Sequence, residues 1–173
     1  MPNKIPDISI KTTEGSDIHL LSWKTPVLLV FLRHFGCTFC REALADIKMK
    51  RSDIEERGVK IVLVHMAEHE IAREYFQKFD LVELESVSDP PCDIYAAFGL
   101  LKGSFKQLFG LRSWIRGFDA GVVQGHGVGM MLGDGFQMPG VFLLKNGKIE
   151  SEFIHKYASD RPDYSALIDC CTV

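Results

Sequence analysis

The sequence predicts an α/β fold in which one central mixed β-sheet is flanked by helices. Patterns of buried strands alternate with patterns of amphipathic helices in the first half of the chain. An antiparallel hairpin signal follows late, and a helical pattern comes after it. The 173 residues are enough for one compact core, so we expect a single domain over residues 1–173.

The first elements are a hairpin, a buried strand and a long helix. Extended segments at 8–10 and 18–20 flank a turn and predict the hairpin. Residues 27–32 are an unbroken apolar run, which is typical of a central strand buried on both faces. A helix over residues 38–57 follows, because apolar side chains recur there at helical spacing and Gly58 can end it.

The later elements complete a sheet covered by helices. We expect strands at 59–64, 86–88, 141–144 and 149–154, and helices at 68–79, at 93–98 and from about 162. Asn146-Gly147 between the last two strands is a strong signal for a tight hairpin turn. The strands at 27–32 and 59–64 and the helix between them form a βαβ unit, so these two strands should be parallel.

Glycine is concentrated in one region that a minimal fold of this kind does not need. Eleven of the 15 glycines lie in residues 99–140, and we expect an insertion at about 99–138. The spacing of Gly125, Gly127 and Gly129 matches no phosphate-binding loop, which favours a flexible loop over a nucleotide site. Basic and apolar residues alternate over 102–116 as on an amphipathic segment, which would cover the reactive site or receive a partner if it is functional.

Cys37 and Cys40 form the only C-x-x-C of the chain, at the start of the helix that follows the buried strand. This placement and the order of elements are typical of a thioredoxin-like fold. A helix N-terminus offers free N–H groups and a positive dipole end, which favour a thiolate. Arg33, His34 and Arg41 lie close in sequence and add positive potential.

We expect Cys37 to attack first, because it meets solvent, and Cys40 to resolve the intermediate from one turn inside. The reverse assignment stays open. A zinc site is the alternative for the pair, but it would have to recruit scattered groups such as His34, His126 or Cys92.

The Met138-Pro139-Gly140 segment stands directly before a predicted strand. In a thioredoxin-like fold this position faces the redox pair. We expect the Met138-Pro139 bond to be cis and close to Cys37, although most X-Pro bonds are trans.

Composition excludes several classes of partner. The net charge of −3 provides no general attraction to nucleic acid or to anionic lipid. The first residues lack the apolar stretch of a signal peptide and no run is long enough to span a membrane, so we expect a cytoplasmic protein. In that reducing compartment Cys92, Cys170 and Cys171 should be free thiols.

Four segments resemble the peroxiredoxin-like (AhpC/TSA-related) family, in the branch that holds prostamide/prostaglandin F synthase and the selenoprotein U and L relatives. They are RHFGCTFCRE, VKIVLVHM, SDPPCDIYAAFGL and QMPGVFLLKNGKI. The resemblance implies a thioredoxin fold and thiol-dependent redox chemistry at Cys37 and Cys40, and more weakly a role for Arg33 and Pro139. The P-x-x-x-T-x-x-C motif of ordinary peroxiredoxins is absent: counted back from Cys40, its proline and threonine positions hold Arg33 and Cys37.

The expected function is therefore that of an antioxidant thiol-disulfide oxidoreductase. Cys37 would attack a small peroxide or a protein disulfide, and Cys40 would close a disulfide that a thioredoxin- or glutathione-type reductant reopens. No bound cofactor or metal is needed for this cycle. A non-catalytic redox-sensing or protein-interaction module that uses the same switch is the alternative.

Overall fold

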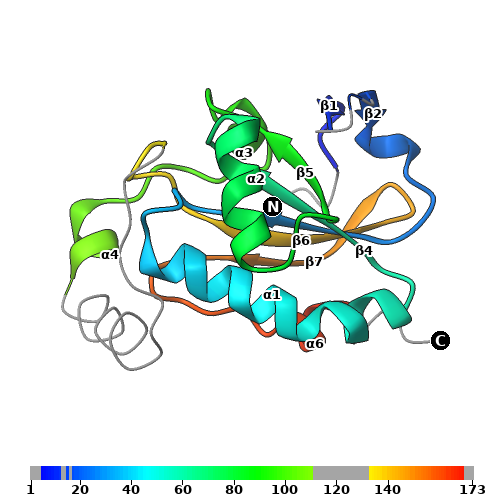
Figure 1. Ribbon diagram of the computed structural model, residues 1–173. Coiled ribbons are helices and arrows are strands. Elements are labelled where there is room, and N and C mark those ends of the chain that lie inside the picture. The colour runs from blue at the N-terminus through cyan, green and yellow to red at the C-terminus, as the bar shows by residue number, and fades with distance from the viewer. Residues whose placement is uncertain (1–4, 13–14, 16, 111–132, 170–173) are drawn as a thin grey trace.

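The computed structural model describes residues 5–12, 15, 17–110 and 133–169. Its centre is a five-stranded sheet (Figure 1). In spatial order the strands are β5 (Glu85–Ser88), β4 (Lys60–His65), β3 (Val27–Phe31), β6 (Gly140–Lys145) and β7 (Lys148–Ile154). The pairs β3–β4 and β4–β5 are parallel, whereas β3–β6 and β6–β7 are antiparallel. The predicted mixed sheet flanked by helices is confirmed.

Strand β3 is the middle strand and every one of its residues is buried. Leu28 and Val30 point into one apolar cluster, while Leu29 and Phe31 point into the other. Because both faces of the strand are covered, the sequence shows a continuous apolar run instead of alternation.

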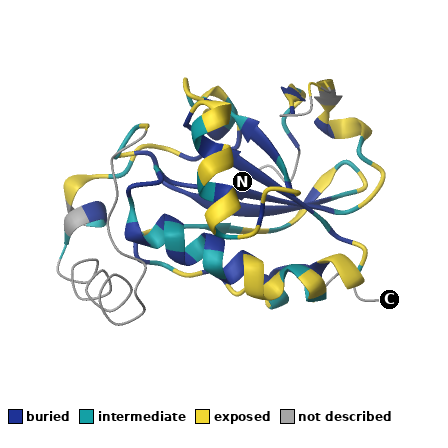
Figure 2. Cartoon of the chain, viewed as in Figure 1, coloured by how far each residue is buried: buried dark blue, intermediate teal, exposed yellow. Residues whose placement is uncertain are grey.

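Three helices cover the first face: α1 (Thr38–Glu56), α2 (His69–Lys78) and α6 (Tyr164–Ile168). Helices α1 and α6 lie next to each other beneath the sheet (Figure 1). The outward surfaces of α2 and of the second half of α1 are exposed, whereas the central strands of the sheet are buried (Figure 2). On α1, Leu44 and Ile47 are fully buried, as their helical spacing predicts.

The second face is covered by the N-terminal hairpin and a short helix. The hairpin pairs β1 (Ser9–Lys11) with β2 (Asp17–His19) in antiparallel register, and the one-turn helix η1 (Leu20–Ser22) follows. Helix α3 (Asp93–Ala97) brings Tyr95 against the sheet. Aromatic rings fill this layer, namely Phe31, Tyr95, Phe98 and Phe142.

The turn between β6 and β7 has the conformation that its sequence predicts. Asn146 and Gly147 both have positive φ, at 52° and 73°. Two left-handed residues in succession make a tight turn whose twist matches the flanking strands.

Part of the predicted insertion lies outside the described residues. The structure describes a short helix α4 (Phe105–Phe109) and then resumes at Gly133. The predictions for the Gly125–Gly129 glycines, for the basic residues Arg112 and Arg116, and for His126, Cys170 and Cys171 fall on residues that are not described. Among the described helices, none is long and apolar enough to cross a membrane.

Candidate active site

Cys37 is the N-cap residue of α1, at the end of the short loop that leaves β3. Its backbone is extended, with φ −78° and ψ 127°, and its side chain is half-buried. The N–H groups of Cys40 and Arg41 donate to the Cys37 carbonyl at 3.0 and 3.3 Å, which closes the first turn. Cys37 and Cys40 are both free thiols. The structure thus places the C-x-x-C at the helix start, where the sequence predicts it.

The Arg33 guanidinium makes a direct polar contact with the Cys37 sulfur. Arg33 Nη1 donates to Cys37 Sγ at 3.0 Å, and the arginine is 6% exposed. Its Nε donates to the Gln137 carbonyl at 3.3 Å and its Nη2 donates to the Gly135 carbonyl. Within the described part of the chain no carboxylate forms an ion pair with Arg33. Arg33 thus presents a buried permanent cation to the Cys37 sulfur, and its other hydrogen-bond partners among the described residues are neutral carbonyls.

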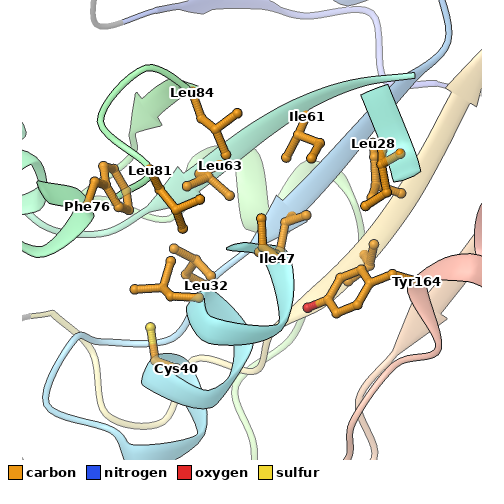
Figure 3. Close-up of a cluster of buried hydrophobic side chains, with 14 of the residues drawn as sticks. Leu28, Leu32, Cys40, Ile47, Ile61, Leu63, Phe76, Leu81, Leu84 and Tyr164 are labelled. Atoms are coloured by element: carbon orange, nitrogen blue, oxygen red, sulfur yellow. The ribbon is translucent and has the colours of Figure 1, made fainter. Parts of the chain in front are cut away.

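Cys40 lies on the inner face of α1, with 2% of its surface exposed. Its sulfur points toward the apolar cluster, near Leu32 (Figure 3). Burial raises the pKa of the Cys40 thiol well above its usual range, and the neighbouring Cys37 raises it further. Cys40 is therefore a protonated thiol in the resting protein, and Cys37 is the sulfur that a molecule in solution can reach.

A small cavity lies beside Cys40. Its volume is about 20 Å³, room for about one water molecule. Its wall includes the polar side chains of Arg33, Cys40, His155 and Tyr164, together with Pro139. The wall of this cavity includes both Cys40 and Pro139 but not Cys37, so the closeness of Pro139 to Cys37 stays a prediction.

His34 does not supply the positive potential that the sequence suggested. Burial, followed by the charge of Arg33, lowers the pKa of His34 to about 4. The imidazole is therefore neutral near pH 7, and that expectation was wrong. Arg41 Nε donates to the Phe35 carbonyl at 3.3 Å, and the Arg41 guanidinium lies 5.9 Å from the Tyr75 ring centre.

The Met138-Pro139 bond is trans, which corrects the prediction of a cis bond. No peptide bond between described residues is cis. The trans form is the intrinsically preferred one, by about 0.5–1 kcal/mol. In this conformation His155 N donates to the Pro139 carbonyl at 3.4 Å, and Gly140 directly after it pairs with Phe31 in the sheet. Met138 itself is buried.

Two residues of the site were missed by the sequence analysis. Gln137 is 2% exposed and its carbonyl holds Arg33. Tyr95 is fully buried, and its hydroxyl donates to the Leu32 carbonyl at 2.6 Å, directly before Arg33 in the chain. Both residues lie in segments that carry the family resemblance, Tyr95 in SDPPCDIYAAFGL and Gln137 in QMPGVFLLKNGKI, but no reactive or ligating pattern marks either as part of the site. The only signal for Gln137 was its place next to Met138-Pro139.

Cys92 lies on the other side of the sheet end, as the N-cap of α3 with φ 63°. It is half-buried, and burial followed by Asp89 raises the pKa of its thiol. Among the residues that the structure describes, no three His, Cys, Asp or Glu side chains group together as metal ligands would. His34 and Cys92 therefore do not complete a zinc site with the C-x-x-C there.

Comparison with known proteins gives three kinds of similarity. A model of the AhpC/TSA family matches residues 1–151. Prostamide/prostaglandin F synthase of Salmo salar is 38% identical over 55 residues, which are 31% of this chain and 28% of that protein. Peroxiredoxin-like 2C of Homo sapiens is 33% identical over 78 residues, 44% of this chain and 34% of that protein. The matched stretches thus span about a third or less of these relatives.

Solved structures share the fold over almost the whole chain. A cysteine-to-serine mutant of peroxiredoxin 6 from Arenicola marina superposes with a TM-score of 0.69 at 12% identity, covering 98% of this chain and 70% of that one. Peroxiredoxin Q from Xanthomonas campestris gives a TM-score of 0.63 at 14% identity, with 96% and 89% covered. At such identities the similarity is one of fold.

Proposed function

Because the chain belongs to the AhpC/TSA family, we propose that it is a thiol-dependent oxidoreductase that reduces a hydroperoxide or a disulfide through Cys37 and Cys40. The observation that carries this proposal is the 3.0 Å contact from Arg33 Nη1 to Cys37 Sγ at the start of α1. It gives an accessible sulfur a permanent cation as its neighbour, which is the environment of a nucleophilic cysteine.

In the first step the Cys37 thiolate attacks one oxygen of a hydroperoxide. The O–O bond breaks, the alkoxide leaves and takes a proton from solvent to become an alcohol, and Cys37 becomes a sulfenic acid. Arg33 can donate to the departing oxygen, because its guanidinium has five N–H donors and three are used by the contacts described above.

In the second step Cys40 attacks the Cys37 sulfur. The S–O bond breaks, the Cys40 proton leaves with the hydroxide as water, and a Cys37–Cys40 disulfide forms. An external thioredoxin- or glutathione-type reductant then attacks Cys37, the more exposed sulfur, and is itself oxidised to a disulfide as both thiols return. With a protein disulfide as substrate, the first product is a mixed disulfide on Cys37, and Cys40 releases it in the same way.

Steady-state turnover tests the proposal. NADPH consumption is followed with thioredoxin and thioredoxin reductase, or with glutathione and glutathione reductase, and with hydrogen peroxide, an organic hydroperoxide or a protein disulfide as oxidant. We expect turnover with at least one oxidant, and mass mapping should find Cys37 joined to Cys40 after mild oxidation.

Single variants separate the two roles. Cys37→Ser should abolish the first step, and Cys40→Ser should trap a sulfenic acid or a mixed disulfide on Cys37. Cys92→Ser is the matched control and should retain turnover. Redox-dependent binding to a partner without turnover would instead support the redox-sensing module. A disulfide that uses Cys92, Cys170 or Cys171 would overturn the assignment of the pair.

A further inference from the structure

The 133–138 segment of the chain fixes the position of the Arg33 guanidinium. Arg33 Nε and Nη2 donate to two carbonyls of this segment, those of Gln137 and Gly135. A guanidinium is a rigid planar fork, so fixing two of its nitrogens also fixes the third. The third is Nη1, which donates to Cys37 Sγ. The contact to the sulfur thus depends on where the 133–138 segment lies.

The 133–138 segment is held by contacts to residues 100–103. On the exposed side, Lys102 Nζ lies 2.6 Å from Asp134 Oδ2. Along the backbone, Gly103 N donates to the Phe136 carbonyl at 2.7 Å. On the buried side, the Gln137 side-chain amide donates to the Leu100 carbonyl at 2.8 Å, and it also donates to the Met138 carbonyl within the segment at 3.2 Å.

These contacts differ in strength. The Lys102–Asp134 pair is open to solvent, with 68% and 28% of the side chains exposed, and such pairs contribute little. The Gln137 amide is buried and both of its N–H donors are used. Without it, two buried carbonyls would lose a donor, which is far more costly than losing an exposed ion pair.

We infer that Gln137 is a positioning residue, whose buried amide holds the 133–138 segment so that Arg33 stays against the Cys37 sulfur. The inference rests on the proposed function in taking Cys37 as the attacking thiol. It extends the site to a residue that touches neither sulfur.

The pH dependence of Cys37 alkylation can report on the contact between Arg33 and the Cys37 sulfur. The other ionisable groups around Arg33 do not change their protonation state between pH 6 and 9. The pKa values of His34, beside it in the chain, and of His155, after β7, are lowered to about 4, mainly by burial. The pKa of Asp134 is lowered by the Lys102 hydrogen bond, and that of Lys102 is raised by the same bond. On α1, burial keeps Cys40 protonated.

The test is the alkylation rate of Cys37 by iodoacetamide, read by mass spectrometry from pH 6 to 9. Gln137→Met removes both N–H donors at similar size, and the matched control is Gln107→Met. The Gln107 amide donates to the Lys156 carbonyl at 3.0 Å and its oxygen accepts from Ser104, whereas Arg33 donates to Gln137, Gly135 and Cys37. We expect Gln137→Met to lower the rate at pH 7 about tenfold, as the loss of a charge-assisted hydrogen bond would. The rate at high pH and the control should be unchanged.

A double-variant comparison shows whether Gln137 acts through Arg33. Arg33→Met alone should lower the rate at pH 7 at least as much, and adding Gln137→Met should lower it no further. If Gln137→Met fails to fold, Gln137→Asn keeps the amide but is one methylene shorter, and its expected drop is about threefold. A drop that persists on the Arg33→Met background, or no drop at pH 7 in a folded variant, would overturn the inference. Alkylation needs no turnover, so this result is independent of whether the protein reduces a peroxide.

Discussion

Removing one oxygen atom from the buried Tyr95 should destabilise the end of the sheet from which the active-site loop departs. The Tyr95 hydroxyl donates to the Leu32 carbonyl at 2.6 Å and lies 3.0 Å from the Val64 carbonyl. Val64 O already accepts from Leu32 N at 2.8 Å. In Tyr95→Phe the loss therefore falls on the Leu32 carbonyl, at the last position before Arg33.

The magnitude follows from burial. Tyr95 is 0% exposed, so no water replaces the lost hydroxyl without a rearrangement. A buried acceptor left without its donor costs about 1–3 kcal/mol, and phenylalanine otherwise fills the same space. We expect the free energy of unfolding to fall by about 2 kcal/mol, and the melting temperature to fall by about 4–8 °C for a chain of this size.

Urea denaturation followed by circular dichroism measures the change. The matched control is Tyr75→Phe, because Tyr75 is only half-buried and its ring stacks on Phe35 at 4.7 Å. The control should change the free energy of unfolding by less than about 0.5 kcal/mol. The reasoning is refuted if Tyr95→Phe is no more destabilising than the control at an unchanged m-value.

Three further predictions concern the fold around the site. The fully buried His65 has its pKa lowered to about 4 by burial, whereas it is about 6.5 in the unfolded chain, so the unfolded chain binds the proton first as the pH falls. The contribution of neutral His65 to the free energy of unfolding is complete above about pH 6.5 and falls by about 2 kcal/mol by pH 5. Denaturation curves of His65→Gln should therefore show a smaller loss of stability on acidification than those of the unchanged protein. Gly133→Ala should destabilise by about 1–3 kcal/mol, because a Cβ would lie 2.8 Å from Met66 Cβ at a φ of +107°; thermal unfolding measures it, and an unchanged midpoint would contradict the contact. Asp46→Asn should cost about 1–3 kcal/mol in urea denaturation, because the buried Asp46 carboxylate accepts from Arg161 Nε at 2.7 Å and from Nη2; Arg161→Met should give a similar loss if the pair is the cause.

The sequence predicted the sheet and its helices because each of those elements carries its own local signal. The run at 27–32 is apolar throughout, which indicates a strand covered on both faces, and this is what β3 is. Asn146-Gly147 marks its hairpin through backbone preferences alone. The position of Cys37 at the helix start follows equally from local signals.

The parts of the site that depend on tertiary contacts could not be predicted in this way. Arg33 meets the carbonyls of Gly135 and Gln137 about 100 positions later in the chain, and no periodic pattern links such distant residues. The charge of His34 depends on how deeply the fold buries it. The Met138-Pro139 bond was assigned from a topological position, whereas its conformation depends on the neighbours that hold the Pro139 carbonyl.

The middle position of β3 has a consequence for synthesis on the ribosome. Its parallel partner β4 follows soon, but its other neighbour β6 pairs Leu144 with Val27, more than 100 residues later. At about 5–20 residues per second, the β6 side of an entirely apolar strand stays without its partner for about 5–20 seconds while the intervening chain emerges. An open strand edge of this kind is a site of intermolecular pairing. The nascent chain should therefore be most prone to aggregation, and most dependent on chaperones, in the interval before β6 leaves the exit tunnel.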